Sequence, residues 1–206
     1  MADLPPPPGD DNPSRNLSSE PTHAVLIHGF AVVAIVFRPL RRALRRQSID
    51  ARLVRYPSIG LPLPDVIDHV ADGLAHVNPE AIVAHSLGCV AAIHAVEATG
   101  WTGPIVLLAP PMRTLPGTRF IPNRLRWPFA PLLDHRRLTK SEPKWPTLSG
   151  CRVRAIAGRY DVMVPHWLTT CDQFDDHRTL PLTHNGLLFS RTVVDLTVEW
   201  IRNLPG

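Results

Sequence analysis

The chain has 206 residues, of which 44% are hydrophobic and 19% are charged, and its formal net charge is +4. These values are ordinary for one globular domain that buries a substantial core. No apolar run approaches the roughly 18 residues that a transmembrane helix needs, and no nucleic-acid-binding motif accompanies the positive charge. Composition therefore gives no support to a membrane-embedded or a nucleic-acid-binding protein.

The three cysteines, Cys89, Cys151 and Cys171, are widely spaced and form no Cys-x-x-Cys pair. This spacing argues against a disulfide framework or a zinc site and favours a reducing compartment. The first residues lack the basic and apolar regions of a secretory signal, so we expect a cytoplasmic protein. Residues 1–22, with four consecutive prolines, predict a disordered tail before one domain at 23–206.

From residue 24 onward, short apolar runs alternate with amphipathic segments. In chain order they predict a strand at 24–27, a helix at 37–47, a strand at 52–56, a helix at 65–77, a strand at 81–84, a helix at 87–98, strands at 104–109 and 153–157, a short helix near 165–175, a strand near 178–182 and a long helix at 187–204. Strands separated by helices predict an α/β fold with a mostly parallel sheet and helices on both faces. Such a sheet carries its functional residues at the carboxyl ends of its strands.

Residues 110–149 interrupt this alternation between the fourth and fifth strands. They are rich in proline and arginine and contain the bulky aromatic residues Phe120, Trp127, Phe129 and Trp145. A connection this long in a small domain is usually functional or disordered. We expect a short lid or cap over the functional edge of the sheet, with an inert loop as the alternative.

A possible nucleophile lies where the third strand meets the following helix. Residues 84–88 read Ala-His-Ser-Leu-Gly, which fits the small-x-Ser-x-small pattern of a nucleophile elbow. Small residues are needed on both sides of Ser86 because the turn is tight. The turn holds the hydroxyl out at the edge of the sheet and aims the positive end of a helix at it. The alternative is a serine that only caps the helix.

Residues 25–30, Val-Leu-Ile-His-Gly-Phe, resemble the first strand and His-Gly-x turn of α/β-hydrolase lipases and esterases. The resemblance extends from about 24 to 204 and is strongest to small bacterial lipase-like serine hydrolases. It implies the α/β-hydrolase fold and an oxyanion hole made by the backbone N–H groups of Phe30 and Leu87. In two places the chain departs from the pattern: Ala84 replaces glycine, and the segment after Pro111 lacks the polar, glycine-rich sequence of similar enzymes.

In this fold the triad follows the order serine, acid, histidine. Asp161 follows the fifth strand and His184 lies between the last strand and the final helix, so Ser86, Asp161 and His184 are the predicted catalytic residues. Asp134, in the long connection, is a competing acid. A turn aspartate and a surface histidine are the non-catalytic alternatives for Asp161 and His184.

Four further residues are candidates for a substrate pocket: His28, His85, Trp127 and Phe129. His28 also belongs to the oxyanion turn, and His85 is as well explained by packing. A helix face with His69, Asp72 and His76 imitates a metal site, but the apolar face opposite it indicates solvated surface. We expect no metal and no cofactor.

The helix at 37–47 carries five arginines on the side opposite its apolar residues: Arg38, Arg41, Arg42, Arg45 and Arg46. The simpler interpretation is the solvent side of a helix that covers the sheet. The alternative is contact with an anionic membrane surface or an acidic partner.

Together these features predict a serine hydrolase that cleaves carboxylic esters with an apolar acyl group, through an acyl-enzyme on Ser86. A thioesterase or an amidase would use the same triad, and a non-catalytic binding protein could keep the same fold. Neither the physiological substrate nor the oligomeric state follows from the sequence.

Overall fold

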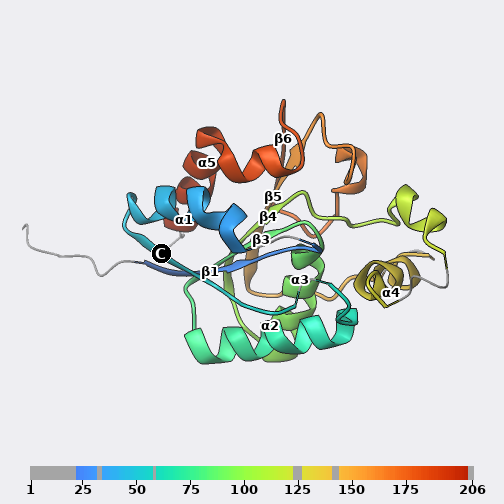
Figure 1. Ribbon diagram of the computed structural model, residues 1–206. Coiled ribbons are helices and arrows are strands. Elements are labelled where there is room, and N and C mark those ends of the chain that lie inside the picture. The colour runs from blue at the N-terminus through green and yellow to red at the C-terminus, as the bar shows by residue number, and fades with distance from the viewer. Residues whose placement is uncertain (1–21, 32–33, 58, 123–126, 141–143, 204–206) are drawn as a thin grey trace, which may run out of the picture.

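Six strands form one sheet in the computed structural model, which describes residues 22–31, 34–57, 59–122, 127–140 and 144–203. The strands are β1 (Thr22–Ile27), β2 (Ile49–Leu53), β3 (Ala81–His85), β4 (Gly103–Leu108), β5 (Cys151–Gly158) and β6 (Asp176–Leu180). They lie in the order β2-β1-β3-β4-β5-β6, and every neighbouring pair is parallel (Figure 1). The predicted tail falls, except for Thr22, on residues 1–21, which lie outside the described residues.

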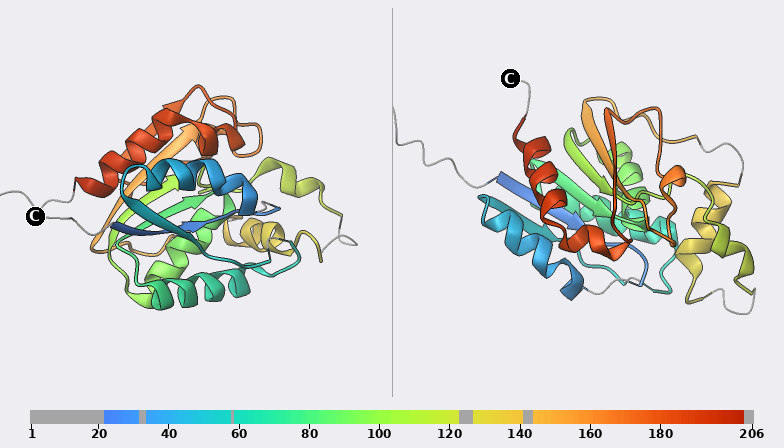
Figure 2. Two further views of the ribbon diagram at one scale, coloured as in Figure 1. Left: turned by 60° about the vertical axis from the view of Figure 1, so that its left-hand side comes forward. Right: turned by 90° about the horizontal axis from the view of Figure 1, so that it is seen from above.

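Helices cover both faces of this sheet. Helices α1 (Arg38–Arg45) and α5 (Arg191–Arg202) lie on one face, and α2 (Leu63–Val77) and α3 (Leu87–Thr99) lie on the other (Figures 1 and 2). Helix α4 (Ala130–Leu138) lies beside α2, and four 3-10 turns complete the described elements: η1 (Ala34–Phe37), η2 (Pro116–Phe120), η4 (His166–Leu168) and η5 (Asn185–Phe189). The predicted α/β-hydrolase arrangement is confirmed.

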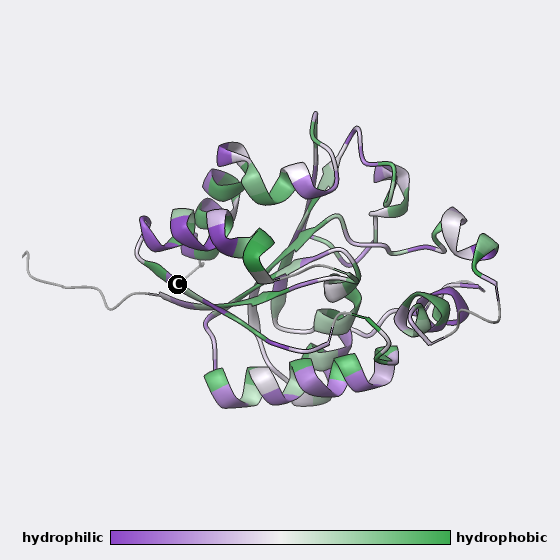
Figure 3. Ribbon diagram, in the orientation of Figure 1, coloured by the Kyte–Doolittle hydropathy of each residue, from purple (hydrophilic) through white to green (hydrophobic). Residues whose placement is uncertain are grey.

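The strands separate two apolar cores because side chains alternate along a strand. In β3, Ile82 and Ala84 face α2 and α3, whereas Ala81 and Val83 face α1 and α5. The strands are almost continuously apolar, as expected when helices bury both faces of a parallel sheet. Figure 3, which is coloured by hydropathy, shows that α1 carries hydrophilic residues along most of its length.

Most predicted boundaries differ from the structure by one or two residues, and three elements differ by more. Strand β2 begins at Ile49, three residues before the predicted start, because Ile49 pairs with Thr22 of β1 directly after a turn at Ser48, whose φ is 56°. The predicted helix at 165–175 contains only the three residues of η4. Thr169 ends it early, since its hydroxyl donates to the carbonyl of His166 at 2.6 Å.

The predicted long final helix is also interrupted. It divides into η5 and α5 at Ser190, whose backbone is extended and whose hydroxyl accepts a hydrogen bond from the N–H of Val193 at 3.5 Å. This serine is an N-cap, and it starts α5 at Arg191. No predicted element corresponds to α4, which lies in the 110–149 segment together with η2. These two elements lie beyond the sheet, near the carboxyl ends of its strands (Figures 1 and 2).

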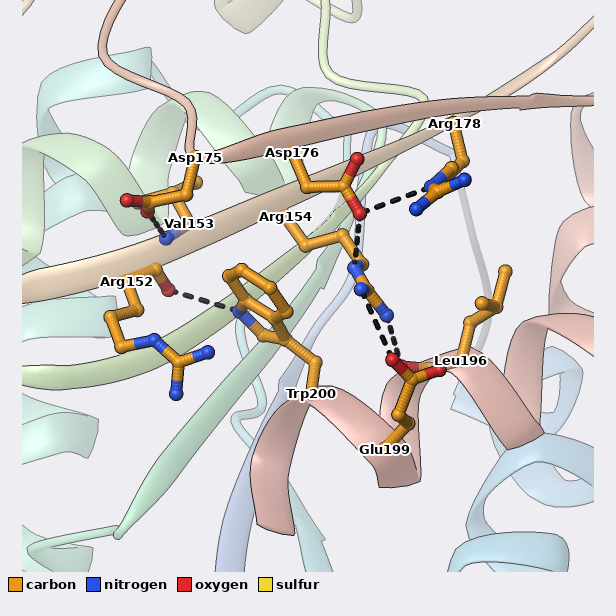
Figure 4. Close-up of polar contacts among 9 residues, drawn as sticks. All are labelled: Arg152, Val153, Arg154, Asp175, Asp176, Arg178, Leu196, Glu199 and Trp200. Atoms are coloured by element: carbon orange, nitrogen blue, oxygen red, sulfur yellow. Dashed lines mark hydrogen bonds and ion pairs between the residues drawn. The ribbon is translucent and has the colours of Figure 1, made fainter. Parts of the chain in front are cut away.

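A buried arginine joins β5 and β6 to α5. The guanidinium of Arg154, which is 4% exposed, lies 2.9 Å from the carboxylate of Asp176 and 3.4 Å from that of Glu199. It also donates to the carbonyl of Leu196 at 3.0 Å. Figure 4 shows the Trp200 ring between Arg152 and Arg154, whose guanidinium carbons each lie 4.4 Å from its centroid. These contacts fix the last helix against the sheet.

The two carboxylates around Arg154 should contribute unequally to stability. We expect Asp176→Asn to lower the free energy of unfolding by about 3 kcal/mol, because it leaves a buried guanidinium without its closest counter-charge. Glu199→Gln should cost less than about 1 kcal/mol, since the Glu199 side chain is 51% exposed. Urea unfolding of the two variants and the parent measures both values. Equal losses would contradict this assignment.

Candidate active site

The turn between β3 and α3 holds Ser86 in a strained backbone conformation. Its φ is 57° and its ψ is −132°, a region that residues other than glycine rarely adopt. The Ser86 N–H donates to the carbonyl of Leu108 on β4 at 2.8 Å, so the turn is anchored to the neighbouring strand. The helix then begins at Leu87. This strand–turn–helix geometry is that of a nucleophile elbow.

Two glycines allow the end of β1 to approach this elbow. A Cβ atom on Gly29 would lie 2.7 Å from the Cβ of Ser86, and one on Gly88 would lie 2.4 Å from the carbonyl oxygen of His28. Both distances are shorter than real carbon contacts. The His-Gly turn after β1 and the Ser-x-Gly turn after β3 are therefore complementary surfaces, and each requires its glycine.

The predicted acid and base are in direct contact. Nδ1 of His184 lies 2.6 Å from Oδ2 of Asp161, and the two side chains are 7% and 0% exposed. The second oxygen, Oδ1 of Asp161, accepts hydrogen bonds from the N–H groups of Met163 at 2.9 Å and Val164 at 2.8 Å. The carboxylate is thus held on both oxygens. It fixes the His184 tautomer with the proton on Nδ1, which leaves Nε2 as the acceptor.

The loops that carry this pair are tied together at the end of β5. The N–H of Tyr160 donates to the carbonyl of Leu182 at 3.0 Å. Gly158 permits the approach, because a Cβ there would lie 2.5 Å from the same carbonyl oxygen. The sequence Gly158-Arg159-Tyr160-Asp161 therefore places the acid beside the loop that carries His184.

His85 supports the His184 loop from inside the protein. The ring is 0% exposed, lies 4.6 Å from the His184 ring between centroids, and meets Phe37 edge-on. Its Nε2 donates to the backbone carbonyl of His184 at 3.2 Å, while Nδ1 has no partner among the described residues. Burial, with the nearby His184 ring, lowers the pKa of His85 to about 3. Because it has no exposed surface, this ring packs and does not line a substrate pocket, contrary to the pocket-lining prediction.

The predicted oxyanion turn is braced by a residue that the sequence analysis did not select. The Tyr56 hydroxyl donates to the carbonyl of His28, and the two rings stack with centroids 4.0 Å apart. Nδ1 of His28 is 3.1 Å from the carbonyl of Gly29. Burial lowers the pKa of His28 and raises that of Tyr56. Tyr56 is the last residue of the predicted strand at 52–56, and only the folded chain reveals its contact with residue 28.

A small, mostly apolar hollow adjoins this turn. Its lining residues are His28, Gly29, Phe30, Tyr56, Pro57, Val66, Leu87, Gly88 and Pro131. Both predicted oxyanion residues therefore border the same space. In the described part of the chain, neither the Phe30 N–H nor the Leu87 N–H donates to another protein group. The Phe129 ring lies 5.6 Å from that of Phe30, which brings one aromatic residue of the 110–149 segment to this edge.

Trp127 and Asp134 lie elsewhere. The Trp127 side chain is 74% exposed and packs over Gly60, away from the hollow that includes His28. Oδ2 of Asp134 accepts a hydrogen bond from the N–H of Leu63 at 3.1 Å, and Oδ1 pairs with Arg137 at 3.2 Å. Asp134 thus holds the start of α2, and Asp161 is the acid beside His184.

No hydrogen bond links the Ser86 hydroxyl to the His184 ring in the described structure. The two residues are connected through His85, which precedes Ser86 and contacts the His184 backbone. In hydrolases without ligand this contact is often long and tightens only with substrate. Burial raises the pKa of the Cys89 thiol, which donates to the carbonyl of Leu108 behind the elbow, so it is not a competing nucleophile.

The outer face of α2 carries the residues that imitate a metal site. Nδ1 of His69 donates to the carbonyl of Asp65 at 2.7 Å, one turn earlier in the same helix. Within the described residues, no three His, Cys, Asp or Glu side chains are grouped to hold a metal ion. No helix among the described residues is both long and apolar enough to cross a membrane.

The strain at Ser86 gives a prediction about stability. We expect Ser86→Gly to raise the free energy of unfolding by about 1 kcal/mol, because relief of the strained φ and ψ outweighs the greater freedom of glycine in the unfolded chain. Ser190→Gly is the matched control, since Ser190 has an ordinary φ of −82° and caps α5. That control should lose stability. Destabilisation by both changes would contradict strain at the elbow.

His85 should make folding sensitive to acid. It remains neutral in the folded protein down to about pH 3, whereas in the unfolded chain it takes up a proton below its ordinary pKa of 6.5. Its contribution to stability is therefore present above pH 6.5 and is lost as the pH falls toward 3. The free energy of unfolding of His85→Gln, measured relative to that of the parent, should be about 2 kcal/mol higher at about pH 5 than at about pH 7. Urea unfolding at the two pH values measures this difference. The control is Ile82→Val, which alters a buried residue that does not titrate, and it should show no such pH-dependent gain.

Residues 24–201 match the family model described as "Alpha/beta hydrolase family". Similar solved structures include polyneuridine aldehyde esterase, which is 15% identical with a TM-score of 0.65 over 86% of this chain and 98% of that chain. The monoacylglycerol lipase of Paleococcus ferrophilus is 13% identical with a TM-score of 0.63, over 87% and 95%.

A third similar structure is the RedJ thioesterase of the prodiginine biosynthetic pathway in Streptomyces coelicolor. It is 14% identical, with a TM-score of 0.62 over 99% of this chain and 91% of that chain. Among curated protein sequences, no significant match was found. The structural likenesses establish the fold, and the family model covers most of the sequence. The chain therefore belongs to the α/β hydrolase family.

Proposed function

We propose that this hydrolase cleaves carboxylic esters by nucleophilic catalysis at Ser86, with His184 as general base and Asp161 as its partner. The observation that carries the proposal is the buried 2.6 Å contact between His184 and Asp161 on loops tied to a strained serine elbow. A surface histidine or a turn aspartate would need neither burial nor this pairing. Mutually oriented polar groups at the carboxyl edge of a parallel sheet are typical of active sites.

The reaction would proceed in two steps through an acyl-enzyme. The Ser86 oxygen attacks the acyl carbon while its proton passes to Nε2 of His184, and Asp161 stabilises the resulting imidazolium through Nδ1. His184 then gives that proton to the leaving alcohol, and the bond between acyl carbon and alcohol oxygen breaks. A water molecule, deprotonated by His184, hydrolyses the acyl-enzyme and restores Ser86.

The tetrahedral intermediates carry a negative charge on the former carbonyl oxygen. The N–H groups of Phe30 and Leu87 are the proposed donors to it, because both border one hollow beside Gly29 and are free of protein acceptors among the described residues. Loss of one such donor typically costs about 3–4 kcal/mol of transition-state stabilisation. Tyr56, by bonding the His28 carbonyl, positions the turn that carries the first donor.

The surroundings of the elbow are mainly apolar, which favours a substrate with an apolar acyl group. The hollow beside Leu87 is lined mainly by apolar side chains, and Phe129 extends that surface from the segment before α4. Membership of the family and the likeness to an esterase and a lipase support ester substrates. The likeness to a thioesterase makes thioesters the second candidate class, because the same triad serves both.

A fluorophosphonate probe tests the proposed nucleophile directly, since it reacts only with an activated serine. We expect one adduct on Ser86, located by mass spectrometry, and none on Ser86→Ala. Asp161→Asn should slow labelling by about 10⁴-fold, because the His184 tautomer is no longer fixed. Asp134→Asn is the matched control and should show no comparable loss, since Asp134 holds α2.

The outcome that would overturn the proposal is a folded protein that forms no adduct, or that forms it at another residue. In that case the chain would be a binding protein with a hydrolase fold. Once Ser86 is labelled, matched oxygen-ester, thioester and amide substrates with the same acyl group distinguish the three possible activities by their kcat/KM values.

A further inference from the structure

The positive charge of the molecule is concentrated on one surface, formed by α1 and the ends of α5. Five arginines of α1 and the residue after it, Arg38, Arg41, Arg42, Arg45 and Arg46, are all exposed. At 100° per residue they occupy an arc of about 140° opposite the fully buried Leu40 and Leu44. Arg191 and Arg202, at the two ends of the neighbouring α5, are exposed as well. These seven arginines are here called the basic face.

Few acidic groups oppose this charge. Among the described residues, no ion pair involves any arginine of the basic face, and Arg202 donates instead to the carbonyl of Gln47. On α5, Glu199 is paired with Arg154, which leaves Asp195 as the acidic group beside Arg46 and Arg191. The seven arginines and Asp195 carry a charge of +6, more than the +4 of the whole chain. The molecule is therefore electrostatically polarised.

The opposite side of the sheet carries the contrasting charge. The outer side of α2 presents exposed Asp65, Asp68 and Asp72, and α2 covers the sheet face that α1 does not (Figure 1). An acidic helix on one face and a basic helix on the other give the molecule a dipole across the sheet. Such a dipole orients a protein as it approaches a charged surface.

Apolar groups accompany the arginines. Ile35 of η1 is 57% exposed and Phe189 of η5 is 58% exposed. Between α1 and the start of α5 there is an open groove, which combines apolar and charged walls. Its lining residues include Pro39, Ala43, Arg46, Leu188, Phe189, Arg191, Val194 and Asp195.

We infer that the basic face docks on anionic phospholipid bilayers. Arginines near such a surface are attracted to its negative potential, and clusters of four to eight basic residues on a helix are typical of this contact. Because the apolar side of α1 is buried in the core, the helix does not insert, and the attraction is electrostatic. The groove then offers arginines to a phosphate headgroup and apolar walls to the adjoining acyl region.

The lipid assignment follows from the combination of charge and apolar exposure. Nucleic acid would be matched by several stacking aromatic side chains along a basic groove, whereas this groove offers one, Phe189, and the arginines of α1 cover the outer side of a helix. Ile35 lies on η1, soon after the predicted oxyanion turn, and Phe189 lies on η5, which begins directly after His184. Docking would therefore bring the site edge of the sheet close to the lipid, in agreement with an apolar ester substrate.

Vesicle sedimentation with the full chain tests the inference. We expect binding to vesicles that mix phosphatidylglycerol with phosphatidylcholine at low salt, none to phosphatidylcholine alone, and release at high salt. The variant Arg41→Gln/Arg42→Gln/Arg45→Gln should partition roughly a hundred-fold more weakly. Glutamine keeps helix propensity, and circular dichroism checks the fold.

A matched control removes the same charge elsewhere. The triple change Arg113→Gln/Arg119→Gln/Lys140→Gln takes three exposed positive groups from the 110–149 segment, and it should bind almost as tightly as the parent. Phe189→Gln should weaken binding several-fold without changing its salt dependence.

Three results would overturn the inference. They are absence of binding to anionic vesicles at low salt, equal weakening by both triple variants, and tighter binding to duplex DNA or to an acidic polypeptide than to vesicles in the same buffer. The readout is partitioning, so it is independent of whether Ser86 is catalytic.

Discussion

The close packing of the turn after β1 against the turn after β3 is the constraint on which the site depends. Ser86 is strained, and strain of this kind persists only when its surroundings allow no other conformation. Here the surroundings are Gly29, Gly88 and the hydrogen bond from Ser86 to Leu108. Strands β1 and β3 are neighbouring inner strands, and their last residues before the turns are buried, which makes that packing rigid. The hydroxyl and the neighbouring N–H groups therefore have fixed places before any substrate arrives.

Burial then determines how the polar groups of the site behave. The Asp161 carboxylate is desolvated but accepts three hydrogen bonds, two from backbone N–H groups and one from His184. His85, equally buried, lacks a charged partner and stays neutral, so it can support the His184 loop without repelling an imidazolium. A low dielectric strengthens such contacts and penalises any unpaired charge. The arrangement links the chemistry of the site to the stability of the fold.

The same layered architecture explains the surface. A sheet covered on both faces leaves each helix with one outward side, and the sequence makes those sides different. Helix α1 presents arginines and α2 presents aspartates, while η2, α4 and the turns after β5 and β6 lie at the carboxyl edge. The charged helix sides and the proposed active-site edge are thus formed by different residues of one scaffold. Substitutions on a helix side therefore need not alter the residues at that edge.

The sequence alone determined the α/β class, the alternation of elements and the spacing of Ser86, Asp161 and His184 along the chain, because these depend on local periodicity and short motifs. Boundaries at Ile49, Thr169 and Ser190 required the tertiary structure, since strand register and side-chain caps override local propensity there. Only the folded chain could bring Tyr56 to His28, place the Asp134 carboxylate of α4 at the start of α2, and bury His85 against His184. Such contacts join residues far apart in sequence, and no local pattern specifies them.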